Sequence, residues 1–278
     1  MIRTLEAELF QAAGAQVGEG PAWDVRHDCL VWVDITAGLV HLTDGRSYDA
    51  GTHVGAALPT EGDGWLLATA EGFAMLDEDG TVTPLLEFVE PGLRCNDAKC
   101  DPSGKAWVGT MSYTEAPGAG SLYRLDPGPS VTPFLSGLTI SNGMDWSPDG
   151  ATMWFTDSVT RVVTGYAYAA GELGAAVSRL EIDPSYGMPD GLCVDVDGCV
   201  WVGLWGGGRV HRYTPDGRLD TVVTVPASQV TSCAFAGSTL YITSAVHRLR
   251  EPEPLAGGLF TIETSTQGPP ATLWKPLR

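Results

Sequence analysis

Six aromatic residues recur along the 278-residue chain at intervals of 33, 42, 47, 47 and 40 residues, each close to a tight-turn signal. They are Trp32, Trp65, Trp107, Trp154, Trp201 and Tyr241. Alternating runs such as "SLYRLD" and "GRVHRYT" lie between them and are typical of short strands, and no long window has good helical periodicity. Repeats of roughly 40–50 residues with several strands each are the mark of a β-propeller. The sequence therefore predicts an all-β, six-bladed β-propeller.

Length and composition favour one propeller domain over residues 1–278. Six repeats use the whole chain, 44% of the residues are hydrophobic, and 35 Gly and 19 Pro supply the many turns that such a fold needs. The segment 4–11, "TLEAELFQ", alternates like a strand. We expect it to close the ring as the outer strand of the last blade, which would hide two sheet edges.

Charge and hydropathy restrict the partners and the location. The net charge of −18 disfavours nucleic acid, which needs a basic face, and an anionic membrane. No run approaches the roughly 18 apolar residues of a membrane span, and the N-terminus has no apolar core of signal-peptide length. We expect a cytoplasmic protein, monomeric or weakly homo-oligomeric. Its six cysteines lack the spacing of zinc ligands and are interpreted as buried free thiols.

Four repeats carry a second turn-like pair ahead of the strand pair, although one turn would be enough. These leaders are Glu19-Gly20, Asn96-Asp97, Asn142-Gly143 and Asp190-Gly191, and each begins 11 to 13 residues before the aromatic of the next strand. Taken singly, they could be additional turns. Their constant offset favours another interpretation, because the innermost strands of a propeller all begin on one face beside the central channel. Side chains at these starts would converge on a common centre.

Two carboxylates and two amides at one centre form a ligand set that suits a hard cation. Ca²⁺ takes roughly 6–8 oxygen ligands from carboxylates, amide carbonyls and water. Glu19 and Asp190 would balance a divalent charge, and Asn142 would add a neutral oxygen. No His occupies a leader position, which disfavours a His-rich zinc site. The sequence thus predicts a central metal-binding channel with coordination positions left open for water and substrate.

The chain also carries a series of longer motifs. "GEGPAWD", "RCNDAKCDPSGKAWVGTM", "GAGSLYRLD", "SNGMDWSPDG" and "PDGLCVDVDGCVWVGLWGGGRV" occur in this order over nearly its whole length. Together they resemble the gluconolactonase/regucalcin (senescence marker protein 30-like) family. The resemblance implies a six-bladed propeller with one divalent cation, Ca²⁺ foremost and Zn²⁺, Mn²⁺ or Mg²⁺ as alternatives. It also implies hydrolysis of aldonolactones, while related members act on other esters and lactones.

The resemblance assigns roles to individual residues. It implies Glu19, Asn142 and Asp190 as direct metal ligands. It places Asn96 near metal and substrate, and Arg94 as a substrate-binding cation. The cation would polarise the lactone carbonyl, and Asp190 would act as the catalytic base for the attacking water. Arg94 and Asn96 would hydrogen-bond sugar hydroxyls.

Two departures from the family pattern affect the substrate rather than the metal. After "GTM" the chain reads "SYTEAPGAGS", so the acidic substrate-contacting position is either Glu115 or lost. "GLWGGGRV" places Trp205 at the pocket mouth. The ends of the second strands should build the rest of the wall: Asp34, Thr110, Met111, Asp157, Ser158, Trp205 and Ser244. For Asp157, support of the metal site and stabilisation of a turn are equally good interpretations.

The leading hypothesis is a metal-dependent lactonase acting on a small sugar-acid lactone. The absence of a G-x-S-x-G elbow disfavours a serine hydrolase. Two alternatives stay open. One is an enzyme of the same fold acting on a different lactone or ester, in biosynthesis or detoxification. The other is a non-enzymatic calcium-binding propeller.

Overall fold

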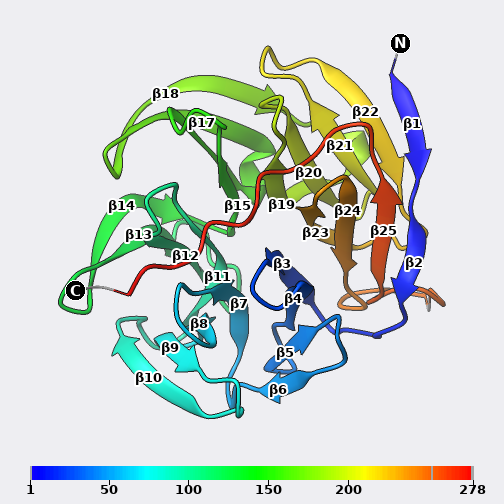
Figure 1. Ribbon diagram of the computed structural model, residues 1–278. Helices are drawn as coiled ribbons and strands as arrows, with labels where there is room; N and C mark the ends of the chain where they lie inside the picture. The colour runs from blue at the N-terminus through cyan, green and yellow to red at the C-terminus, as the bar shows by residue number, and fades with distance from the viewer. Residues whose placement is uncertain (1, 252, 277–278) are drawn as a thin grey trace.

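The short alternating runs of the sequence become strands that form six separate sheets around a common centre (Figure 1). The structure is a computed structural model and describes residues 2–251 and 253–276. The sheets follow one another along the chain, so that each is a blade of a six-bladed β-propeller. The fold predicted from the spacing of the aromatics is confirmed.

The first three blades each have four strands. Their bounds are β3 (Gly18–Asp24), β4 (Cys29–Asp34), β5 (Leu39–Leu42) and β6 (Ser47–Asp49) in blade one; β7 (Val54–Pro59), β8 (Trp65–Thr69), β9 (Gly72–Leu76) and β10 (Val82–Glu87) in blade two; and β11 (Leu93–Cys100), β12 (Ala106–Ser112), β13 (Gly120–Asp126) and β14 (Ser130–Leu138) in blade three.

The other three blades repeat the pattern, with two short 3₁₀ turns, η1 (Ser158–Thr160) and η2 (Pro184–Tyr186). Their bounds are β15 (Ser141–Trp146), β16 (Thr152–Asp157), β17 (Val162–Ala169) and β18 (Glu172–Glu181) in blade four; β19 (Met188–Val194), β20 (Val200–Trp205), β21 (Arg209–Tyr213) and β22 (Leu219–Thr224) in blade five; and β23 (Val230–Ala236), β24 (Thr239–Ser244) and β25 (Leu259–Glu263) in blade six.

The N-terminal segment is divided between two blades. β2 (Glu8–Gln11) pairs antiparallel with β25 and is the outer strand of blade six, the position expected for the whole segment. β1 (Arg3–Glu6) lies instead in blade five, parallel to β22. Between them, the backbone N–H of the buried Ala7 donates to Thr224 O, at 2.9 Å. The alternating sequence pattern of residues 4–11 predicts a strand, but it does not show that this segment passes from one sheet to another at its midpoint.

The repeating tryptophans fill the core. Trp107 and Trp201 are at most 1% exposed, and each indole N–H still needs an acceptor. Asp101 and Asp195, in the turn just before each strand, supply it at 3.1 and 2.9 Å. The same carboxylates accept backbone N–H groups of their turns. In blades three and five, one aspartate therefore fixes the spacing from turn to tryptophan by bonding both.

The segment after β25 crosses one face of the ring toward blade three (Figure 1). We call residues 264–276 the C-terminal strap. Its backbone hydrogen-bonds Val196 of blade five through Gln267 O, and it reaches Pro59 and Gly104 of blades two and three through Trp274 and Lys275. Within the described residues, no helix has both the length and the apolar character needed to span a membrane.

Candidate functional site

The leader residues lie at β-bulges on the innermost strands. The register of every innermost strand shifts against its partner, and in blades three, four and five the skipped pairs are Asn96-Asp97, Asn142-Gly143 and Asp190-Gly191. In blade one the shift follows Glu19 directly. A bulge re-aims a side chain out of the regular alternation of a strand. The leaders are therefore bulges beside the channel and not additional turns.

The glycines that follow Asn142 and Asp190 allow neighbouring blades to approach closely. A Cβ on Gly143 would lie 2.5 Å from Asp190 O and 2.7 Å from Leu192 N. A Cβ on Gly191 would lie 2.4 Å from the Ser232 Cβ. Real Cβ atoms do not approach other atoms so closely, so only glycine permits the contact between β15, β19 and β23. These contacts set the distance between the leader side chains.

One cavity of about 220 Å³ opens where the innermost strands begin. It is lined by all of the metal ligands and substrate contacts predicted from the sequence: Glu19, Arg94, Asn96, Glu115, Asn142, Asp190 and Trp205. The topology thus brings together side chains from blades one, three, four and five, as their common offset indicated. Their roles in binding and catalysis stay predictions.

The two carboxylates at the base of this cavity repel each other. Glu19 and Asp190 are 5% and 6% exposed. Burial foremost, and then Asp190 and Asp97, raise the pKa of Glu19 well above its ordinary value. Burial and Asp97 likewise raise the pKa of Asp190, against the opposing effects of Asn142 and Arg94. Two buried like charges are stable together only when protonated or when a cation lies beside them.

The amide oxygen of Asn142 is free to coordinate a cation. Its Nδ2 donates to Ser158 Oγ at 3.2 Å, which fixes the orientation of the amide. Its Oδ1 is buried and has no hydrogen-bond partner. An unpaired buried acceptor beside two carboxylates fits an all-oxygen site for a hard divalent cation. Among the described residues, no three His, Cys, Asp or Glu side chains form a metal-binding group, so the cation would need this amide as its third protein ligand.

Arg94 faces the cavity on a rigid support. Its Nη1 donates to Cys95 O at 2.9 Å and to Asn96 Oδ1 at 2.7 Å, and burial lowers its pKa. The Asn96 Nδ2 donates in turn to Ser141 O of blade four, at 2.9 Å. Asn96 therefore holds Arg94 in place, and within the described part of the chain the other guanidinium nitrogens have no hydrogen-bond partner and are left for a ligand. Cys95 packs away from the cavity, as strand alternation predicts.

An ion pair spans the cavity mouth. Glu115, in the connection between β12 and β13, receives Arg248 Nη1 at 2.7 Å from the connection between β24 and β25 of blade six. Glu115 thus lies in the pocket, but its carboxylate is already paired. Both residues have positive φ, 53° and 60°. Trp205 also lines the cavity and adds an aromatic side chain to its wall.

Part of the predicted wall is wrong. Met111, Ser158 and Trp205 line the cavity, whereas four other predicted wall residues lie behind it: Asp34, Thr110, Asp157 and Ser244. Asp34 accepts the backbone N–H groups of residues 16 and 17, and Asp157 those of 139 and 140. Each carboxylate therefore fixes the entry of its own blade's innermost strand, and Asp157 has the turn-stabilising role. Thr110 and Ser244 hydrogen-bond within their own blades.

The sequence reasoning missed several lining residues, foremost Tyr113, His247 and Arg248. None of them belongs to an innermost strand, so the repeat does not mark them. His247 and Arg248 lie in the segment 245–258, the longest connection between a second and a third strand. Long connections on the cavity face are the signal that could have indicated them.

The chain matches the model of the SMP-30/Gluconolactonase/LRE-like region over residues 17–246. It is 35% identical to regucalcin of Danio rerio, over 83% of each chain. It is 34% identical to pentonolactonase XacC of Haloferax volcanii, over 92% of this chain and 93% of the relative. The solved structure of regucalcin from Agrobacterium tumefaciens, described as a calcium-binding protein, matches with a TM-score of 0.93 at 28% identity and covers 99% of both chains. The chain therefore belongs to the SMP-30/gluconolactonase/LRE-like family, which confirms the resemblance seen in the motifs.

Proposed function

We propose that this protein is a divalent-metal-dependent lactonase that opens a sugar-acid lactone. The observation that carries the proposal is the base of the cavity, where two buried carboxylates with raised pKa values flank an amide oxygen that has no partner. Glu19, Asn142 and Asp190 would hold the cation, with Ca²⁺ favoured by the all-oxygen donor set. The lactonases and the calcium-binding regucalcin among its relatives support the same assignment.

A bound cation would supply a Lewis acid at the lactone carbonyl. Its positive charge would also keep Asp190 ionised despite burial, because an opposite charge nearby favours the charged form. A carboxylate has two oxygens, so Asp190 can serve as a ligand through one and accept the proton of the attacking water through the other. The adjacent bulge and Gly191 hold this carboxylate at the channel.

The upper part of the cavity would select the substrate. Arg94 presents free guanidinium donors, which suit the several hydroxyl oxygens of a sugar lactone. Trp205 offers an apolar surface for the C–H face of a sugar ring. An alkyl lactone offers far fewer acceptors, so these groups favour a polyhydroxylated substrate.

The test uses Asp190→Asn and the exposed control Asp63→Asn. After chelation and addition of each divalent ion, we expect wild type and Asp63→Asn to hydrolyse sugar lactones in a pH-indicator assay. The activity of Asp190→Asn should fall more than roughly 100-fold, which exceeds the effect of changing a residue that is not a direct metal ligand. Near-normal turnover of Asp190→Asn with the ion restored would exclude Asp190 as the base. Calcium binding by calorimetry with no hydrolysis of any lactone would instead identify a binding propeller.

A further inference from the structure

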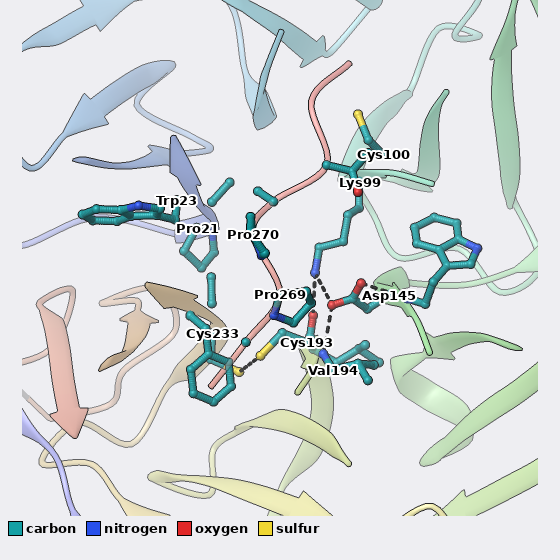
Figure 2. A pocket seen from close by; sticks show the side chains of 18 of the residues that line it. Pro21, Trp23, Lys99, Cys100, Asp145, Cys193, Val194, Cys233, Pro269 and Pro270 are labelled. Carbon is teal, nitrogen blue, oxygen red and sulfur yellow. Dashed lines mark hydrogen bonds and ion pairs between the residues drawn. The ribbon is translucent and has the colours of Figure 1, made fainter. Parts of the chain in front are cut away.

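A second cavity, of about 200 Å³, lies at the other end of the channel and contains two thiols in contact (Figure 2). Cys193 on β19 and Cys233 on β23 have their Sγ atoms 3.6 Å apart. The two side chains are 5% and 1% exposed, and both are free thiols. They lie on the innermost strands of adjacent blades, five and six. The lactonase proposal makes no use of them.

The backbone around this pair is held closely on both sides. Gly191 and Ser232 precede the two cysteines on their strands, and a Cβ on Gly191 would lie 2.9 Å from the Ser232 Cα. The strands β19 and β23 therefore approach each other tightly here. On either side of Cys193, Leu192 O accepts from Lys99 Nζ at 3.1 Å, and Val194 N donates to Asp145 Oδ2 at 2.9 Å. The thiols therefore face each other across a narrow gap between two closely packed strands.

The geometry points to an oxidisable pair: we propose that Cys193 and Cys233 form an internal disulfide that links blade five to blade six. An S–S bond is about 2.05 Å long, so the sulfurs must approach by about 1.5 Å, which side-chain rotation and a small strand movement can supply. The cavity admits a small oxidant such as hydrogen peroxide. Its wall includes the strap residues Pro269 and Pro270, which lie beside the pair in Figure 2.

The reaction balances with peroxide as the named oxidant. One thiolate attacks the O–O bond to give a sulfenic acid and hydroxide. The second sulfur then displaces the sulfenic oxygen, which leaves as water, and the S–S bond forms. In total, two thiols lose two hydrogen atoms, and one peroxide is reduced to two molecules of water.

The surroundings make this reaction depend on pH. Burial foremost, and then Cys233, raise the pKa of the Cys193 thiol well above its ordinary value. The charged groups that face it are Lys99 from β11, which opposes the shift, and Asp145 from β15, which adds to it. Because the thiolate is the reacting form, disulfide formation should be slow at neutral pH and faster in alkali.

The experiment treats the full-length protein with hydrogen peroxide at mildly alkaline pH, followed by alkylation under denaturing conditions. We expect the number of free thiols to fall from six to four and the intact mass to drop by two hydrogens. The peptide map should contain one disulfide-linked pair of peptides, which carry Cys193 and Cys233. A phosphine reductant should reverse all three changes. The oxidised protein should unfold several degrees higher, because the bond restrains the unfolded chain.

In Cys193→Ser and in Cys233→Ser, peroxide treatment should no longer remove two free thiols. Cys100→Ser is the matched control, because Cys100 lines the same cavity but is not part of the Cys193–Cys233 contact. This variant should still lose two thiols on oxidation. The proposal is overturned if six thiols persist, if the mass rises by added oxygen, or if another pair or a covalent dimer forms. Should the serine variants fail to fold, the peptide map of wild type decides alone.

Discussion

Gly143→Ala adds a single methyl group where β15 meets β19, between two proposed metal ligands. The new Cβ would lie 2.5 Å from Asp190 O, 2.7 Å from Leu192 N and 2.9 Å from Leu192 Cγ. Ordinary carbon contacts are about 3.5–4.0 Å, so the two strands must separate by roughly 1 Å. Two of the three clashing atoms are backbone atoms, so no side-chain rotation relieves the contact.

Overpacking of this kind typically costs about 1–3 kcal/mol. At about 2–4 °C per kcal/mol for a large domain, the melting temperature should fall by roughly 2–12 °C. Because the same movement displaces Asn142 from Asp190, calcium affinity should also fall at least about 10-fold. Thermal unfolding with chelator or calcium measures the first effect, and titration calorimetry measures the second.

Gly62→Ala is the matched control. The nearest atom to a Cβ there is Thr60 Oγ1 at 3.9 Å, and the backbone is not left-handed. This change should leave calcium binding intact and stability equal or slightly higher, because it restricts only the unfolded chain. If Gly143→Ala melts and binds calcium like Gly62→Ala, the close approach of the blades does not set the position of the ligands.

Three further predictions concern the substrate, the pH dependence and the ring seam. Arg94→Ala should lower kcat/KM for sugar lactones roughly 5–150-fold, since an unpaired buried donor costs about 1–3 kcal/mol, and spare a plain alkyl lactone; an equal loss on both substrates would assign Arg94 to the fold or the chemistry. In chelator, Glu19 and Asp190 have raised folded pKa values, so their stabilisation is complete below the ordinary values of 4.5 and 3.8 and is lost as the pH rises through the folded values. Urea unfolding should therefore show wild type losing stability relative to a Glu19→Gln/Asp190→Asn variant from acid toward neutral pH, together with an increasing gain from calcium, because this comparison cancels carboxylates with lowered pKa values such as Asp24 and Asp101; a flat or rising difference would contradict the repulsion. Deleting residues 1–12 should expose the edges of β22 and β25 and cause aggregation, measured by light scattering, whereas an equally soluble and heat-stable truncation would refute that closure.

The blade repeat was predictable from the sequence because equivalent positions of successive blades carry similar residues at regular intervals. Trp107 and Trp201 each follow an aspartate by six residues, and that aspartate accepts the buried indole N–H. The crossing of the N-terminal segment from blade six to blade five left no such trace. Parallel pairing with β22 depends on which sheet edge is free, and that is a property of the assembled ring.

The base of the site was predictable for the same reason, and its mouth was not. Asn142 and Asp190 occupy equivalent positions of two repeats, so their common offset placed them together. Arg248 and Glu115 come from connections of different length on blades six and three, where no repeat relates them. Asp34 misled the sequence analysis because a strand end near the channel can point either to the cavity or to its own backbone, and hydrogen bonding decides between them.

The pairing of the N-terminal strands also sets an order on folding. Arg3 pairs with Thr221 and Glu8 with Thr261, so blades five and six need partners from the opposite end of the chain. Blades one to four are made of consecutive hairpins and can form from local contacts as soon as they leave the ribosome. Closure must wait for contacts of very high sequence separation, which slow folding far more than they weaken the final state. Formation of the last two blades should accordingly be the slow step of folding. We expect proteases to cleave the chain first at the seam between these blades.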